Sequence, residues 1–130
     1  MRLAAATNLD YGLVSASTNV TVNSLQVRRR GGRLREAKGP WPFGTLAFIA
    51  VLIPRRTIEL IGLLDERYTS YAWEDVDYCR RVTEAGLKLG IHDGCYVDHG
   101  SLTSTFRGDP RAPGSIDAGR RIYLEKWGTM

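Results

Sequence analysis

The chain has 130 residues, a mass of 14.5 kDa, 43% apolar residues and a net charge of +4. A composition this rich in apolar residues excludes an intrinsically disordered chain and predicts a single domain over residues 1–130. The longest apolar run, residues 46–53, is far too short to span a bilayer, and no signal peptide is visible. We therefore expect a cytoplasmic protein.

In the first half of the chain, the apolar patterns predict strands. Residues 12–16 read as a short buried strand that ends in a polar turn at residues 17–19. Residues 20–27 can line another extended segment, and the Arg-, Gly- and Pro-rich residues 28–42 predict a loop. The continuous β-prone run of residues 46–53 predicts a central strand buried on both faces.

In the second half, strands alternate with helices. Pro54 ends the preceding strand and can open a helix that runs to about Ile61, with Gly62 as its cap. The further elements expected are a helix over residues 75–85, strands over residues 87–91 and 95–97, and a C-terminal helix over residues 116–127. This alternation indicates the α/β class.

Basic residues crowd around Gly31 and Gly32. They are Arg28, Arg29, Arg30, Arg33, Arg35 and Lys38. One interpretation is a solvated loop. The other is a basic lip that attracts the phosphate of a nucleotide sugar, an anionic lipid head group or nucleic acid. No aromatic residue is interleaved with these arginines, so nucleic acid is not the expected partner.

The two cysteines, Cys79 and Cys95, belong to separate predicted elements. Free thiols are the default expectation for a reducing cytoplasm. A disulfide between them stays open, because it depends on geometry that the sequence does not contain.

Three carboxylates stand at the start of the helix expected over residues 75–85. They are Glu74, Asp75 and Asp77, and His99 arrives on a later extended segment. The amide donors and the positive end of a helix stabilise carboxylates there, which can hold an ionised acid in place as a general base. On these residues alone, an acidic helix cap is the preferred interpretation. Asp77 and Arg81 are spaced to pair along the helix surface.

Several short segments match the motifs of one family in order and spacing. They are residues 12–19, the apolar strand that ends at residues 52–56, and residues 61–68, 71–81, 84–86, 97–99 and 123–128. In this order they resemble the C-terminal, acceptor-side half of a family 2 glycosyltransferase with the GT-A fold, over residues 8–127. The resemblance implies a partial GT-A fold: a mixed sheet with flanking helices that lacks the N-terminal nucleotide-binding half.

The resemblance also implies an activity, which is inverting transfer of a hexosyl group from a nucleotide sugar to a hydroxyl group. In this family the role of general base would fall to Asp75, and Glu74 would orient the acceptor. Trp73 and Tyr71 look like platforms for an acceptor sugar. His99 matches a position where relatives often hold a divalent metal ion, manganese or magnesium. A histidine at the end of a strand can equally satisfy a backbone carbonyl.

The chain departs from the family at the donor site. Complete members carry an Asp-x-Asp motif before the strand equivalent to residues 12–16, whereas here the only such pattern is Asp75-Val76-Asp77, which belongs to the later motif. The nucleotide-binding residues are therefore unknown, and a metal ion would be weakly held.

Three hypotheses follow from this departure. The chain could be the acceptor-side part of a transferase, with a nucleotide sugar, a glycan or lipid-linked acceptor, and a partner chain that carries the donor half. It could be a non-catalytic glycan- or anion-binding remnant of the fold. It could be an oligomeric assembly module whose uncovered strand edges pair. Peripheral membrane contact is compatible with all three.

Overall fold

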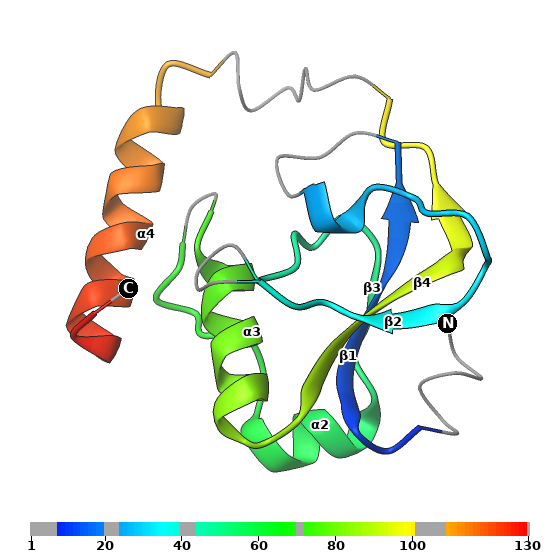
Figure 1. Ribbon diagram of the computed structural model, residues 1–130. Coiled ribbons are helices and arrows are strands. Elements are labelled where there is room, and N and C mark those ends of the chain that lie inside the picture. Colours follow the sequence, from blue (N-terminus) through cyan, green and yellow to red (C-terminus); the bar gives the residue numbers. More distant parts are fainter. Residues whose placement is uncertain (1–7, 20–23, 40–43, 70–71, 101–108, 130) are drawn as a thin grey trace.

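The computed structural model describes residues 8–19, 24–39, 44–69, 72–100 and 109–129. They form a small mixed α/β domain with a four-stranded mixed sheet and three α-helices, which confirms the expected α/β class (Figure 1). The strands are β1 (Tyr11–Thr18), β2 (Leu34–Glu36), β3 (Val51–Leu52) and β4 (Lys88–Val97). The helices are α2 (Arg55–Ile61), α3 (Glu74–Glu84) and α4 (Ala112–Trp127), and a short 3-10 turn, η1, spans Ser24–Gln26.

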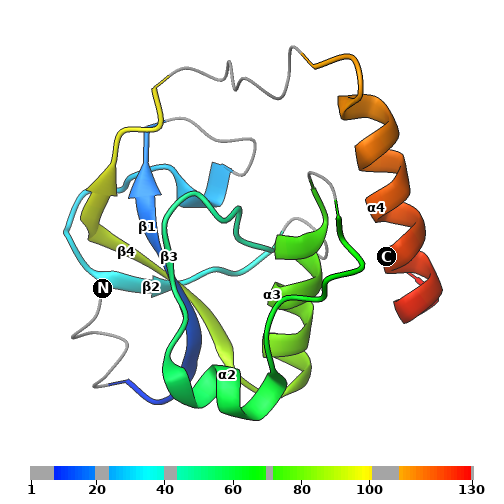
Figure 2. The same cartoon turned by 180° about the vertical axis from the view of Figure 1, so that it is seen from behind.

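The sheet has the order β2-β4-β1-β3. Its centre is the parallel pair β1 and β4, and the short outer strands β2 and β3 run antiparallel to their neighbours. Helix α3 leads straight into β4 through a tight turn at Gly86, where φ is 76°, so α3 must run antiparallel to β4. The N-terminus of α3 therefore lies toward the carboxyl ends of β1 and β4 (Figures 1 and 2). In α/β sheets this edge is where ligands commonly bind.

The core forms between α3 and one face of the parallel pair. Seven of the eight residues of β1 are buried, as expected for the strand predicted over residues 12–16. The fully or nearly fully buried members of the core are Leu13, Leu46, Tyr78, Cys79, Val82, Leu89 and Ile91. Removing one such aliphatic side chain from water contributes roughly 1.5–3 kcal/mol, so the α3 face is held mainly by apolar burial.

The helices at residues 54–61 and 75–85 are confirmed. Gly62 caps α2 with φ of 82° and a backbone hydrogen bond to the Ile58 carbonyl, as the sequence predicted. Helix α4 starts at Ala112, four residues before its predicted start. No helix in the described residues is both long and apolar enough to cross a membrane.

The prediction of a central strand over residues 46–53 is wrong. Only Val51–Leu52 forms a strand, and this strand is half-buried at the edge of the sheet. The reason is Gln26, whose side-chain amide accepts a hydrogen bond from Ala47 N (2.7 Å) and donates one to Ala47 O (2.9 Å). The side chain of Gln26 thus replaces a neighbouring strand as the partner of this backbone.

Other boundaries also differ from the sequence prediction. The two strands predicted over residues 87–91 and 95–97 are parts of one strand, β4, which begins at Lys88 and has an irregularity in its pairing with β1 between Ala16 and Ser17. The loop predicted over residues 28–42 contains the short strand β2. Instead of an extended segment up to residue 27, residues 24–26 form a 3-10 turn, and residues 20–23 lie outside the described part.

Candidate functional site

The acidic pair Glu74 and Asp75 opens α3 at the carboxyl edge of the sheet. The two residues before it, Ala72 and Trp73, have φ of 80° and 81°. They are the only non-glycine residues with positive φ in the described part of the chain. Such a backbone costs of the order of 1–3 kcal/mol per residue, and it persists only where the surroundings enforce it. Conformational strain of this kind is often found at functional sites.

Helix α4 enforces this turn by packing against it. A Cβ atom added at Gly119 would lie 2.7 Å from the Ala72 carbonyl oxygen and 2.9 Å from Cδ1 of Trp73. The Trp73 ring packs on Tyr123, with the ring centroids 5.2 Å apart. The amide of Asp77 donates to the Trp73 carbonyl oxygen from 2.9 Å. The position of the acidic pair therefore depends on the docking of α4.

We expect Gly119→Ala to destabilise the protein by about 1–3 kcal/mol, because the added methyl group meets backbone that cannot easily move. The matched control is Gly114→Ala on the same helix, where the new Cβ has no atom within 4 Å. This control should be neutral or stabilising by up to about 1 kcal/mol, since alanine favours helix. Urea unfolding measures the free energy of unfolding of both variants. Equal stability of the two variants would contradict the close packing at Gly119.

Asp75 is a partly exposed carboxylate held only by backbone amides. Its Oδ1 accepts a hydrogen bond from Val76 N at 2.8 Å, and the backbone of Phe48 donates to it as well. No basic side chain in the described residues forms an ion pair with it. Burial raises the pKa of Asp75 and outweighs the backbone hydrogen bonds that lower it. The N-terminus of the helix thus does not determine the direction of the pKa shift of Asp75. With its raised pKa, Asp75 is a stronger base than an ordinary aspartate.

Glu74 stands beside Asp75 with an unsatisfied oxygen. Its Oε2 is buried and has no hydrogen-bond partner among the described residues. Burial raises the pKa of Glu74, and the negative charge of Asp75 raises it further. A buried carboxylate oxygen without a donor costs free energy, so it is suited to receive a hydroxyl group from a ligand.

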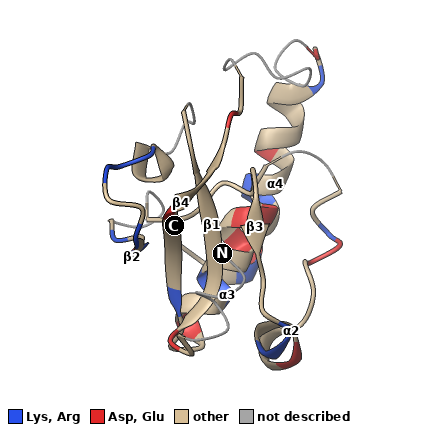
Figure 3. Cartoon of the chain, turned by 90° about the vertical axis from the view of Figure 1, so that its right-hand side faces the viewer, with Lys and Arg blue, Asp and Glu red and all other residues tan. Residues whose placement is uncertain are grey.

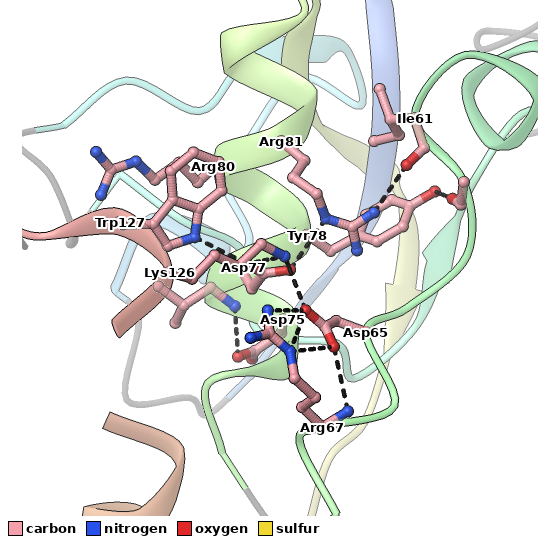
Figure 4. A network of polar contacts seen from close by, with 12 residues as sticks. Ile61, Asp65, Arg67, Asp75, Asp77, Tyr78, Arg80, Arg81, Lys126 and Trp127 are labelled. Atoms are coloured by element: carbon pink, nitrogen blue, oxygen red, sulfur yellow. Dashed lines mark hydrogen bonds and ion pairs between the residues drawn. The ribbon is translucent and has the colours of Figure 1, made fainter. Parts of the chain in front are cut away.

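Asp77, in contrast, is structural. It is fully buried and its carboxylate is surrounded by donors from α3 and α4 (Figure 4). Arg81 Nε lies 3.0 Å away, which confirms the predicted pair, and Trp127 Nε1 lies 2.8 Å away. Lys126 Nζ lies 2.9 and 3.0 Å from its two oxygens. Asp77 therefore links α3 to the C-terminal helix α4.

The network continues to the segment that follows α2. Lys126 Nζ also contacts Asp65 at 2.9 Å, and Arg67 contacts the same carboxylate at 2.7 Å. The side-chain hydrogen bond from Arg67 is the largest cause of a pKa of Asp65 held well below its usual range. Figure 4 shows these groups gathered on the outer side of α3. They fix α4 against α3 and so support the turn at Ala72 and Trp73.

His99 lies just beyond β4, at the same edge of the sheet as Asp75. Its backbone amide donates to Asn19 Oδ1 at 2.9 Å, and Asn19 Nδ2 donates to Asp98 Oδ1 at 2.7 Å. The imidazole is exposed and has no hydrogen bond or ion pair to Asp75 within the described structure. Asn19 thus fixes the turn that carries His99 beside the end of β1.

The described residues do not form a complete metal site. No group of three or more His, Cys, Asp or Glu side chains that could hold an ion occurs among them. No disulfide joins Cys79 and Cys95, which answers the question that the sequence left open. Burial raises the pKa of the Cys79 thiol to about 12, which makes it an inert core residue.

The remaining predicted site residues are placed as follows. Trp73 is half-buried, with its ring against Tyr123. Tyr71 lies outside the described residues. The sequence analysis missed Gln26, whose contacts with Ala47 hold the backbone segment that donates to Asp75. It also missed the left-handed turn, because no glycine marks it.

Comparison of the chain with protein-family models, with curated proteins and with solved structures found no match.

Proposed function

We propose that this chain is the acceptor-side part of a GT-A-type, family 2 glycosyltransferase that acts with inversion. It would take part in hexosyl transfer from a nucleotide sugar to a hydroxyl group of a glycan or lipid-linked acceptor. The observation that carries the proposal is the acidic pair Glu74 and Asp75. Both have a raised pKa, both lie at the carboxyl edge of the parallel strands, and neither has a basic partner in the described structure.

In this reaction Asp75 is the general base. Its carboxylate takes the proton of the acceptor hydroxyl while the oxygen attacks the anomeric carbon of the donor. The bond from that carbon to the nucleoside diphosphate breaks on the opposite face, which inverts the configuration. A base with a raised pKa accepts the proton more readily than an ordinary aspartate, provided that the working pH keeps it ionised.

Glu74 is the residue that orients the acceptor. Its unpartnered Oε2 can accept a hydrogen bond from a second hydroxyl group of the same sugar. The half-buried Trp73 ring stands next to it in sequence and supplies an apolar surface for the C–H face of that sugar. Two polar contacts and one flat surface are enough to place a sugar ring relative to Asp75.

The donor site is assigned to another segment or a partner chain, because no Asp-x-Asp pair other than Asp75-Val76-Asp77 occurs in the sequence. A manganese or magnesium ion would find one imidazole at His99. The described residues alone do not fit such an ion, so no step of the proposal runs through it.

Acceptor binding tests the proposal on the chain itself. The wild-type chain should retain a subset of sugars on a glycan array, and Glu74→Ala should weaken that binding roughly 10- to 100-fold, as expected for a hydrogen bond to a charged group. The control is Glu84→Ala at the other end of α3, where the side chain is 62% exposed. If no glycan is bound, or if the two variants behave alike, the acceptor site is not at Glu74.

A further inference from the structure

The loop between η1 and β2 carries four arginines whose side chains form no close ion pair in the described structure, although the charge of Arg29 acts on Asp93. They are Arg28, Arg29, Arg30 and Arg33. Figure 3 shows the basic residues of this loop together on one side of the molecule, beside β2 and away from α4. Residues 28–32 surround an open hollow of about 440 Å³. All four of these arginines are exposed to solvent.

Arg35, the fifth arginine, is different because it is structural. Its guanidinium contacts Asp93 at 2.6 Å and donates to the carbonyl oxygens of Leu25 and Val27 at 2.7 and 3.2 Å. The same carboxylate accepts the Arg29 backbone amide at 3.0 Å. Asp93 therefore anchors the loop through Arg35 and the backbone, and its charge is already compensated.

Apolar side chains are exposed next to these arginines. Val27, Tyr96 and Val97 are 38%, 42% and 36% exposed. Their backbones lie together at the end of β1, because Thr18 pairs with Val97 of β4 and with Val27, and Ser17 pairs with Tyr96. Arg28 lies over the Tyr96 ring, with Cζ 5.0 Å from the ring centroid. This end of the sheet therefore exposes guanidinium groups, an aromatic ring and aliphatic side chains.

We propose that this basic apolar surface, formed by the four arginines with Val27, Tyr96 and Val97, docks the protein onto a bilayer that contains anionic phospholipids. Arginines bind lipid phosphates, while the exposed aliphatic and aromatic side chains can enter the head-group region. Free phosphate would account for the arginines but not for the apolar side chains. Single-stranded nucleic acid would need several free aromatic faces, and Arg28 already lies over the ring of Tyr96. This inference does not depend on the proposed transferase activity.

Vesicle sedimentation tests the surface directly. The wild-type chain should bind vesicles of phosphatidylcholine mixed with phosphatidylglycerol, should not bind phosphatidylcholine alone, and should be released by salt. Arg29→Gln/Arg30→Gln should lower the partition coefficient about 30-fold, which corresponds to roughly 1 kcal/mol per arginine near an anionic surface. Tyr96→Ser should also weaken binding, and free inorganic phosphate at equal ionic strength should compete no better than chloride.

The matched control removes the same charge from another surface. Arg120→Gln/Arg121→Gln changes two exposed arginines of α4 and should leave vesicle binding within about twofold of the wild-type value, because these residues lie away from the loop. Equal loss in both double variants would show that net charge alone is responsible and would overturn the docking surface. Equal binding to neutral and anionic vesicles, or arginine-dependent binding to RNA without vesicle binding, would overturn it as well.

Discussion

Asp77→Ala is expected to destabilise the protein by about 3–5 kcal/mol, which is the usual cost of removing one partner from a buried charge network. The carboxylate is fully buried and contacts Arg81, Lys126 and Trp127. Its loss removes an acceptor from two cations and from an indole N–H, and among the described residues Lys126 keeps only Asp65 as a carboxylate partner. Since a domain is stable by about 5–15 kcal/mol, urea unfolding should show a loss of a large share of the total.

In Asp77→Ala, unfolding should begin at α4. Hydrogen exchange should show that the amides of Ala112–Trp127 lose protection before those of β1 and β4, because the strands are held by the separate apolar core. The control is Asp117→Ala, an exposed carboxylate on the outer side of the same helix. A loss below about 1 kcal/mol in Asp77→Ala would show that the network is not what docks α4.

Asp75→Asn is expected to reduce glycosyl transfer by at least about 100-fold, the lower end of the usual contribution of a general base. The amide has nearly the same shape as the carboxylate and cannot take a proton. The Val76 amide can still donate to its oxygen, so the fold should be retained. The measurement is release of nucleoside diphosphate from a panel of nucleotide sugars, with acceptor, manganese and the partner that supplies the donor site.

The pH dependence gives an independent readout of the same residue. The rate should fall as the pH decreases through the pKa of Asp75, which burial places above the ordinary aspartate value. Below that pKa the base is protonated and cannot accept the hydroxyl proton. The residual rate of Asp75→Asn should lack this acidic limb. An identical limb in the variant would assign the titration to another group, with Glu74 the first alternative.

Helices were predicted well from this sequence, and the reasons are local. The segments 55–61 and 74–84 have an apolar period and a glycine just after their ends, at Gly62 and Gly86. The apolar period and the terminal glycine both depend only on residues close together in the sequence. The pairing of Asp77 with Arg81 was also predictable, because four residues in a helix place two side chains on one face.

The errors arose where distant residues decide the conformation. The apolar run 46–53 has the composition of a central strand, but Gln26, which is 21 residues away from Ala47, satisfies its backbone instead. The left-handed turn at Ala72 and Trp73 has no sequence signal, because Gly119 of α4 creates the space for it. A short apolar run does not specify its own partner.

The same reasoning applies to the candidate site. The acidic pair and its place at a helix start could be predicted from the sequence. The direction of the pKa shift of Asp75 could not be predicted, because it depends on how deeply the surrounding structure buries the carboxylate. The shared edge of Asp75 and His99 follows from the tight turn at Gly86, which makes α3 run antiparallel to β4.

The most direct test of the account measures acceptor binding and sugar transfer on the same sample of Asp75→Asn. If Asp75 is the base that deprotonates the acceptor, the variant binds the acceptor glycan as the wild-type chain does and transfers sugar to it at 1% of the wild-type rate or less, in line with a loss of about 100-fold or more. Transfer at the wild-type rate by a correctly folded Asp75→Asn variant would contradict the account.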